Sequence, residues 1–191
     1  MLEKGVWLNE PKVWNLTTDQ LTVTTDEGSD FWQKTHYGFV HDSGHFFAQN
    51  ITGDFTAQIH VKACYKSLYD QAGLMIRVDE NTWIKAGIEL SDGELMLGSV
   101  LTIGSSDWAT GAFTGGDSGV WLRVTLVNGV MKIQWSDDGK RWPLLRLCNF
   151  PDVETYQVGP MCCSPITGGM NADFSAFSIN PPLYKDLHDL S

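Results

Sequence analysis

The chain has 191 residues, of which 42% are hydrophobic and 12% aromatic, enough to bury the core of one domain. Its formal net charge is -10, from 23 acidic and 13 basic residues, and such a surface repels nucleic-acid phosphates and anionic lipids. Neither a run of signal-peptide length near the start nor a membrane-spanning stretch is visible. We therefore expect a cytoplasmic protein that binds neither nucleic acid nor membrane.

Cysteine usage agrees with this expectation. Cys64, Cys148, Cys162 and Cys163 show no C-x-x-C spacing. Adjacent residues of a strand point to opposite faces, so Cys162 and Cys163 are poor joint ligands for one metal ion. Reduced, mostly buried thiols are predicted.

The first third of the chain predicts short strands separated by turns. Weak alternation over residues 5–25 predicts two strands around a turn at 17–20. The aromatic-rich stretch DFWQKTHYGFVHDSGHFFAQNITGDF follows, and we predict a hairpin in it that turns at Ser43-Gly44. Residues 55–61 then alternate as one long strand.

Residues 69–102 predict a meander of three antiparallel strands, with turns at 79–81 and 91–94. One face of its first two strands is apolar and is predicted to be core. The other face carries Gln71, Gly73, Met75 and Arg77 on the first strand, opposite Glu89, Gly87, Lys85 and Trp83 on the second. An aromatic ring beside hydrogen-bonding groups is typical of sugar-binding surfaces, although a solvated outer face explains the same pattern.

The Gly-, Ser- and Asp-rich residues 103–119 lack a period and predict a long surface loop. Trp108 within it is either a binding residue or an anchor that pins the loop.

The remainder predicts more strands. Asn128-Gly129 signals a hairpin over residues 121–135, and further strands are expected at 156–163 and 172–179. No segment has the period of a helix. The sequence thus predicts an all-β sandwich in a single domain, residues 1–180, with a C-terminal tail at 181–191.

No metal or cofactor site is predicted. His36, His41 and His45 crowd into ten residues, but a hairpin at Ser43-Gly44 sends His41 and His45 to opposite faces. Nucleotide-binding and catalytic motifs are missing. If the protein is an enzyme, Glu89 is the best catalytic candidate, with a second carboxylate such as Asp70 or Asp107 brought from a loop.

Several stretches together resemble the DUF1349 family, also called the regulation of enolase protein 1 family. They are DFWQKTHYGFVHDSGHFF, GDFTA, YDQAGLMIRVDENTWIKAGIE, GSVLT followed by SSDW, and SDDGKRW. The YDQAGLMIR and WIKAGIE segments are also similar to the C-terminal β-sandwich of some β-xylosidases. The resemblance implies a concanavalin A-like jelly roll of two curved antiparallel sheets, with a concave face that binds or cleaves glycans in fold relatives.

Three hypotheses follow. The first is a domain that binds a carbohydrate or sugar-derived ligand through Gln71, Arg77, Trp83, Lys85, Glu89 and Trp108. The second is a glycosidase-like enzyme that uses Glu89 and a loop carboxylate. The third is a protein-interaction module that regulates a metabolic enzyme, as the family name suggests. The first hypothesis predicts that replacing both Trp83 and Glu89 by alanine abolishes binding but leaves folding largely intact. The oligomeric state cannot be predicted from the sequence.

Overall fold

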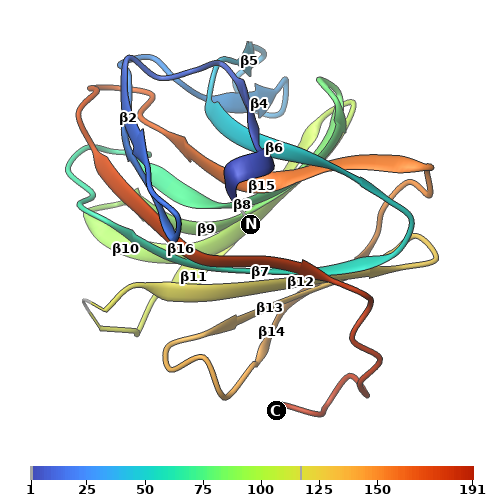
Figure 1. The fold of residues 1–191 in the computed structure, drawn as a ribbon. Coiled ribbons are helices and arrows are strands. Elements are labelled where there is room, and N and C mark those ends of the chain that lie inside the picture. The colour runs from blue at the N-terminus through green and yellow to red at the C-terminus, as the bar shows by residue number, and fades with distance from the viewer. Residues whose placement is uncertain (1, 117) are drawn as a thin grey trace.

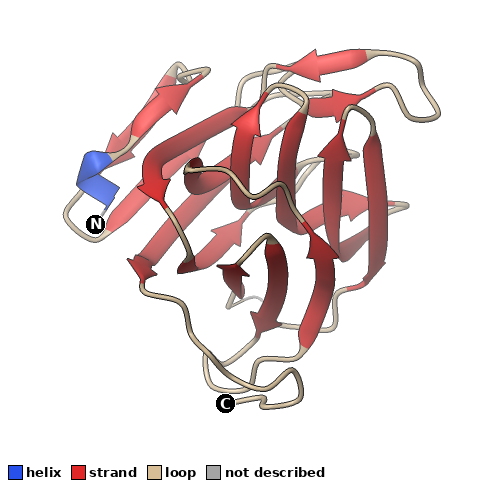
Figure 2. Cartoon of the chain, turned by 90° about the vertical axis from the view of Figure 1, so that its right-hand side faces the viewer, coloured by secondary structure: helices blue, strands red, loops and turns tan. Residues whose placement is uncertain are grey.

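The structure is a computed structural model that describes residues 2–116 and 118–191. It is an all-β sandwich of two seven-stranded antiparallel sheets, as predicted (Figure 1). Helical structure in the described residues is limited to one 3-10 turn, η1 (Leu2–Lys4), near the N-terminus (Figure 2). None of the described helical residues forms a helix long and apolar enough to cross a membrane.

The first sheet contains the predicted meander at its centre. In spatial order its strands are β1 (Val6–Leu8), β6 (His45–Thr52), β15 (Thr155–Cys163), β8 (Gln71–Asp79), β9 (Thr82–Ser91), β10 (Glu94–Ile103) and β11 (Ser106–Ala112). The predicted pairing of β8 with β9 is confirmed, because Arg77 lies opposite Trp83 and Gln71 opposite Glu89.

The second sheet contains the predicted Asn128-Gly129 hairpin. In spatial order its strands are β14 (Leu144–Asn149), β13 (Val130–Ser136), β12 (Val120–Val127), β7 (Phe55–Ala63), β16 (Asn171–Asn180), β3 (Gln20–Thr24) and β2 (Val13–Leu16). Leu126 lies opposite Met131 and Val124 opposite Ile133, as the alternation predicts.

The main core fills the space between the two sheets. Strand side chains alternate between faces, so each sheet contributes every second residue to it. Leu74 and Ile84 from the first sheet and Ile59 and Val124 from the second are fully buried there. The apolar face predicted for the meander is therefore the core face.

The hairpin predicted at Ser43-Gly44 is wrong. Instead β4 (Phe31–Gln33) pairs with β5 (Val40–Asp42), with Phe31 opposite Asp42, and the chain then enters β6 of the first sheet. Left-handed backbone at Lys34 and His36, both with φ of 62°, lets the intervening loop turn. The small β4–β5 hairpin lies at the top of Figure 1.

The long irregular loop predicted at 103–119 is also corrected. Residues 106–112 form β11, an edge strand in which Trp108 lies opposite Val100. The sequence conceals this strand because Trp108 is its one large apolar residue and six of its seven residues are exposed, so no alternation of buried and exposed residues is visible. Position 117 of the predicted loop lies outside the described residues.

Residues near the C-terminus contact the outer face of the second sheet. The amide of Trp142 donates to Leu190 O at 2.8 Å, and Lys132 Nζ donates to Lys185 O at 3.2 Å. These contacts place the end of the chain on the side opposite the β4–β5 hairpin (Figure 1).

Candidate functional site

The outer face of the meander is largely covered by the β4–β5 hairpin. Under the hairpin lies a second hydrophobic cluster, separate from the main core. Its buried members are Phe31, Phe46, Ala48, Met75, Trp83, Val100, Met161 and Cys163. The side of the sheet that the sequence presents as polar and aromatic is thus partly a second core.

The hairpin buries both Trp83 and Arg77 and contacts each of them. Trp83 has no exposed surface, its ring lies 6.1 Å from that of Phe31, and its Nε1 donates to Glu80 O at 3.3 Å. Arg77 is 5% exposed and forms a two-pronged ion pair with Asp42 of the hairpin. We therefore place these two residues outside the candidate site, because the hairpin covers them.

A cavity of about 330 Å³ remains open between the hairpin and the first sheet. It lies between the loop of the hairpin, the β9–β11 side of the first sheet and the residues around Ile166. Its volume is that of a small-molecule site.

Aromatic side chains form the walls of this cavity. They are Trp32, Tyr37, Phe39, His41, Tyr69 and Trp108. Trp32 contacts Trp108 edge-on at 6.4 Å between ring centroids, and Tyr37 stacks on Phe39 at 5.0 Å. Trp108, Tyr37 and Phe39 remain 38 to 48% exposed, so part of each ring surface is free to contact a ligand.

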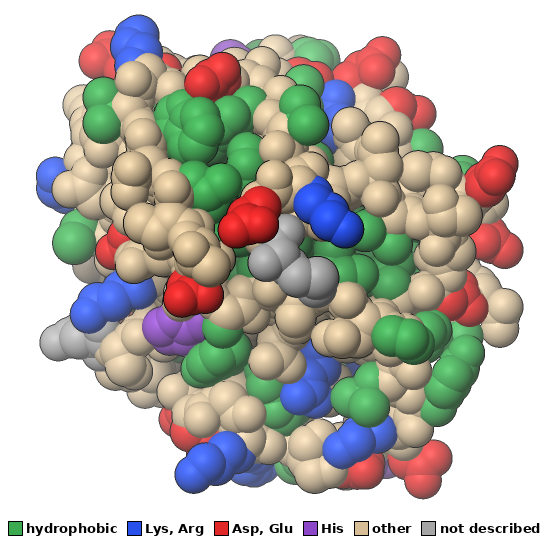
Figure 3. Space-filling model, in the orientation of Figure 1, with side chains coloured by type: hydrophobic (Ala, Val, Ile, Leu, Met, Phe, Trp, Pro, Cys, Tyr) green, Lys and Arg blue, Asp and Glu red, His purple; other side chains and the backbone are tan. Residues whose placement is uncertain are grey.

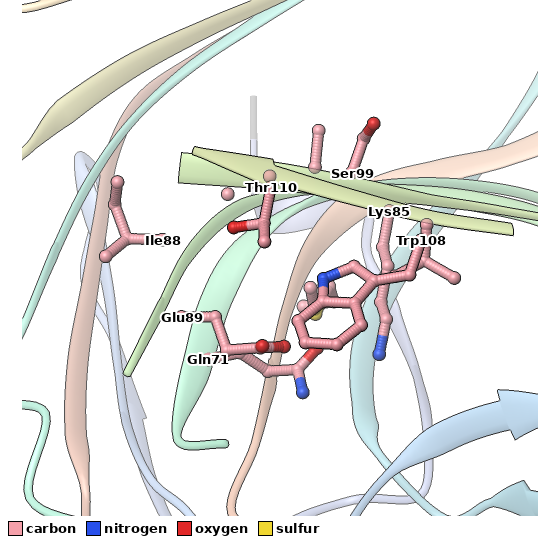
Figure 4. Close-up of a pocket in the computed structure, with 12 residues that line it drawn as sticks. Gln71, Lys85, Ile88, Glu89, Ser99, Trp108 and Thr110 are labelled. Atoms are coloured by element: carbon pink, nitrogen blue, oxygen red, sulfur yellow. The ribbon is translucent and has the colours of Figure 1, made fainter. Parts of the chain in front are cut away.

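Polar groups form the floor. Gln71 and Glu89 lie opposite each other on β8 and β9, and Lys85 lies on the same face of β9, four residues before Glu89. Figure 4 shows the Gln71 amide, the Glu89 carboxyl and the indole of Trp108 gathered in one pocket, with the Lys85 side chain reaching past them. Asp30, from the loop before β4, completes the set.

The partners of these groups differ in one important respect. Lys85 Nζ donates to Phe31 O at 2.8 Å and lies 3.7 Å from Asp30 Oδ1. Gln71 Nε2 donates to Tyr69 O at 3.2 Å. Glu89 Oε1, in contrast, is buried without any hydrogen-bond partner among the described residues. A buried acceptor without a partner is costly, so a hydrogen-bond donor that reaches this carboxyl group would be stabilising.

Burial also alters the acidity of the site. It raises the pKa of Glu89 to about 7, with Asp30 adding to the rise and Lys85 opposing it. The hydrogen bond between the Tyr69 and Tyr37 hydroxyls, 3.2 Å apart, is the main reason that the pKa of Tyr69 rises to about 12. Glu89 therefore changes charge near neutral pH, whereas Tyr69 keeps its proton.

Four of the predicted site residues come together here: Gln71, Lys85, Glu89 and Trp108. The walls supplied by Trp32, Tyr37 and Phe39, and the carboxylate of Asp30, were missed. The only sign of these residues in the sequence was the high density of aromatic residues between positions 30 and 39. Without the β4–β5 pairing, however, nothing in the sequence brings that segment over the meander.

The two loop carboxylates considered as partners for Glu89 lie elsewhere. Asp70 is fully buried and accepts from the backbone amides of Lys66 and Ser67 and from Ser164 Oγ. Asp107 pairs with Arg146 of the second sheet at 3.0 Å. Both have structural partners, which leaves Asp30 as the carboxylate beside Glu89.

The histidines do not cluster around a common point. His45 is buried, with Nδ1 2.7 Å from Asn9 O and Nε2 accepting from the Asp26 amide, while His41 packs on Phe39. Within residues 2–116 and 118–191, no three His, Cys, Asp or Glu side chains are placed to hold a metal ion.

The family model described as "Protein of unknown function (DUF1349)" matches residues 7–182. The chain belongs to the DUF1349 family. The "Regulation of enolase protein 1" of Saccharomyces cerevisiae is 52% identical over 190 residues, covering all of this DUF1349 chain and 96% of the yeast protein.

Solved structures show the same fold. A functionally unknown protein from Saccharomyces cerevisiae, 51% identical, superimposes with a TM-score of 0.94 over 96% of this chain and 99% of its own. A glycoside hydrolase family 43 protein from Bacillus licheniformis gives 0.73 at 15% identity, over 95% of this chain and 37% of its own. A legume lectin-like domain from Entamoeba histolytica gives 0.64 at 9% identity, over 94% and 91%. The concanavalin A-like architecture implied by the family resemblance is confirmed.

Proposed function

We propose that this protein binds a small sugar or sugar-derived ligand in the cavity between the β4–β5 hairpin and the first sheet. The observation that carries the proposal is the combination of aromatic walls with the unpartnered, buried Glu89 Oε1 at the floor. A ligand with flat apolar faces and hydroxyl donors around its edge satisfies both features.

The chemistry of the walls supports a ring-shaped ligand. The CH faces of a pyranose pack against indole and phenol rings, and Trp108 and Tyr37 both present exposed ring surface to the cavity. The Gln71 amide and the Glu89 carboxyl then offer hydrogen bonds to hydroxyls at its edge. A purely apolar ligand would leave Glu89 Oε1 without a partner.

The fold relatives give support by analogy. A lectin-like domain and glycoside hydrolase family 43 proteins share this sandwich, although their identity to the chain is 15% or less in the examples above. A fold hosts many functions, so the weight of the proposal rests on the cavity.

Catalysis is the second candidate, and one observation favours it. Glu89, with a pKa of about 7, is a suitable proton donor, and Asp30 lies near enough to influence that pKa. Asp30 is then the loop carboxylate of a glycosidase-like pair, which requires a separation of about 5 to 9.5 Å between carboxyl groups. Release of product from any ligand that binds distinguishes this candidate from binding alone.

A regulatory role is the third candidate, and it rests on the name of the yeast relative. Under this proposal the protein acts on a metabolic enzyme in the cytoplasm. Binding of a sugar in the cavity would then make that action depend on the sugar concentration. The four cysteines are free, which suits a reducing compartment.

Thermal-shift measurements with a panel of monosaccharides and oligosaccharides test the primary proposal, because a ligand that binds only the folded state raises its Tm. We expect a stabilising sugar whose effect is lost in Trp108→Ala. Trp14→Ala is the matched control, because Trp14 is similarly exposed (36% against 38%) but lies on β2 of the second sheet. Absence of a shift with every sugar, or equal loss in both variants, would refute binding in this cavity.

A further inference from the structure

We infer that the cavity selects sugars that carry a protonated amino group, with the ammonium placed against Glu89. This inference rests on the proposed function and narrows its ligand class to amino sugars, in preference to neutral or phosphorylated sugars.

The first step concerns which charges at the cavity are already neutralised. Lys85 is the sole lysine or arginine among the described lining residues, and its side chain is 4% exposed. Its ammonium is committed to Phe31 O and to Asp30. A phosphate or carboxylate on a ligand would therefore meet no free cation, and desolvating such an anion without a partner is unfavourable.

The second step concerns the charge that is left over. Asp30 and Glu89 are two carboxyl groups that share one ammonium, and Asp30 takes the contact with it. When Glu89 is ionised, its buried Oε1 has no hydrogen bond, and the nearby Lys85 ammonium offsets only part of the cost of burying that charge. A ligand ammonium supplies a donor and a compensating charge together, and hydrogen bonds between charged groups are stronger than neutral ones.

The walls add to this preference. Trp32, Tyr37 and Trp108 surround the space above Glu89 with electron-rich rings. Such rings attract a cation that lies over their faces, most strongly where water is excluded. The arrangement thus resembles an aromatic enclosure with an acidic floor, which is a cation-binding geometry.

The distant charges act in the same direction. The chain carries a net charge of -10. On the face shown in Figure 3, acidic and basic side chains are interspersed, so that face presents no broad basic surface to attract anions. The summed field favours the approach of cations and disfavours that of anions.

The titratable groups around Glu89 fix how binding depends on pH. Lys85 lies on the same strand, Asp30 precedes β4, Tyr69 precedes β8, and Cys163 faces it from β15. His41 of β5 also lines the cavity. Burial raises the pKa of Glu89 to about 7, whereas burial also raises the pKa of Cys163 and so keeps that thiol neutral. Glu89 is therefore the carboxyl that must lose a proton when an ammonium binds.

Calorimetric titration with matched ligand pairs tests the inference. Each pair compares an amino sugar with its N-acetyl form, which keeps the ring but removes the charge: glucosamine, galactosamine and mannosamine with their acetylated counterparts. Glucose, galactose and glucose 6-phosphate complete the panel.

For at least one of the three pairs we expect the amino sugar to bind about tenfold more tightly than its acetylated form at pH 7.5. The affinity should rise between pH 6 and 7.5 and fall again where the free amine loses its own proton. At pH 6.5, where the ligand ammonium is already formed and Glu89 is largely protonated, titration in two buffers of different ionisation enthalpy should show proton release.

Glu89→Gln is the decisive variant. It keeps the shape of the side chain and removes its charge. The ratio of the affinities of the amino sugar and its acetylated form should therefore fall from about ten to about one, while the acetylated sugar still binds. Equal binding of both members of every pair in the native protein, or tighter binding of the phosphate, overturns the inference and leaves the sugar-binding proposal standing. Absence of binding by the whole panel overturns both. A retained preference in Glu89→Gln, with an unchanged pH profile, would also contradict the inference, because the selectivity would then arise elsewhere.

Discussion

Both carboxylate oxygens of Asp42 accept hydrogen bonds from the guanidinium of Arg77, at 2.6 and 2.9 Å. Asp42 ends β5 of the small hairpin, whereas Arg77 lies in β8 at the centre of the first sheet. The Arg77 side chain is 7% exposed, so the pair is largely withdrawn from water. This ion pair fastens the hairpin, and with it the aromatic wall of the cavity, onto the sheet.

Asp42→Ala should therefore destabilise the protein by about 2 to 4 kcal/mol, because it leaves a buried guanidinium without its counter-ion. Urea unfolding measures the loss, and Lys12→Ala is the control, since Lys12 forms an exposed pair with Asp26 whose removal should cost under about 1 kcal/mol. Ligand binding should weaken in Asp42→Ala as the hairpin loosens. A variant as stable as the native protein would show that the pair does not hold the hairpin.

Trp83→Ala should cost about 3 to 5 kcal/mol of folding free energy, because it empties the second hydrophobic cluster. Trp108→Ala removes a similar ring from the neighbouring edge strand and should cost about 1 kcal/mol or less, since Trp108 is 38% exposed. Equilibrium unfolding of the two variants gives the comparison. The structure thus corrects the expectation that the joint loss of Trp83 and Glu89 leaves folding largely intact. Equal stability of Trp83→Ala and the native protein would contradict the burial found here.

The face of the strand on which Trp83 lies was correctly predicted, but its burial was not. Period-two alternation fixes the face of a strand on which a side chain lies, and the pairing of Arg77 with Trp83 follows from the short turn between β8 and β9. What later covers that face is a long-range property. The covering hairpin depends on left-handed residues such as Lys34 and His36, which no turn rule predicts, because lysine does not favour that conformation and histidine adopts it in only a minority of cases.

The candidate site shows the same division. Gln71, Lys85 and Glu89 were predicted as neighbours because they share two adjacent strands. Trp32 and Tyr37 could not be joined to them, because the contact depends on where a distant segment lands. The partners of the side chains could not be predicted either. In the sequence Arg77 and Glu89 are both charged residues on the same sheet face, yet Arg77 is paired with Asp42 and Glu89 has no partner at Oε1.

The raised pKa of Glu89 predicts that stability falls as pH rises. Its folded pKa is about 7 against an ordinary 4.5, so the folded state binds more protons between these values, and the stabilisation present below pH 4.5 is lost through pH 7. Allowing for partial exposure of the side chain, Glu89→Gln should gain about 2 kcal/mol at pH 8 and nothing near pH 4. Denaturation from pH 4 to 8 measures both limits. A constant difference between the variants across that range would show that Glu89 titrates normally.

Gly87→Ala should destabilise the sheet beneath the cavity. Gly73 and Gly87 lie opposite each other on β8 and β9, and a Cβ at Gly87 would overlap the carbonyl oxygen of Ala72 on the neighbouring strand. Backbone cannot yield as a flexible side chain does, so we expect a loss of about 2 kcal/mol or more. Gly111→Ala on β11 is the matched control, because a Cβ there meets nothing within 4 Å and should change stability by less than about 0.5 kcal/mol. Chemical denaturation of the pair gives the result. Since Gly87 lies between Lys85 and Glu89, its variant should also disturb the floor of the cavity, and ligand binding that persists unaltered in a destabilised Gly87→Ala would place the ligand elsewhere.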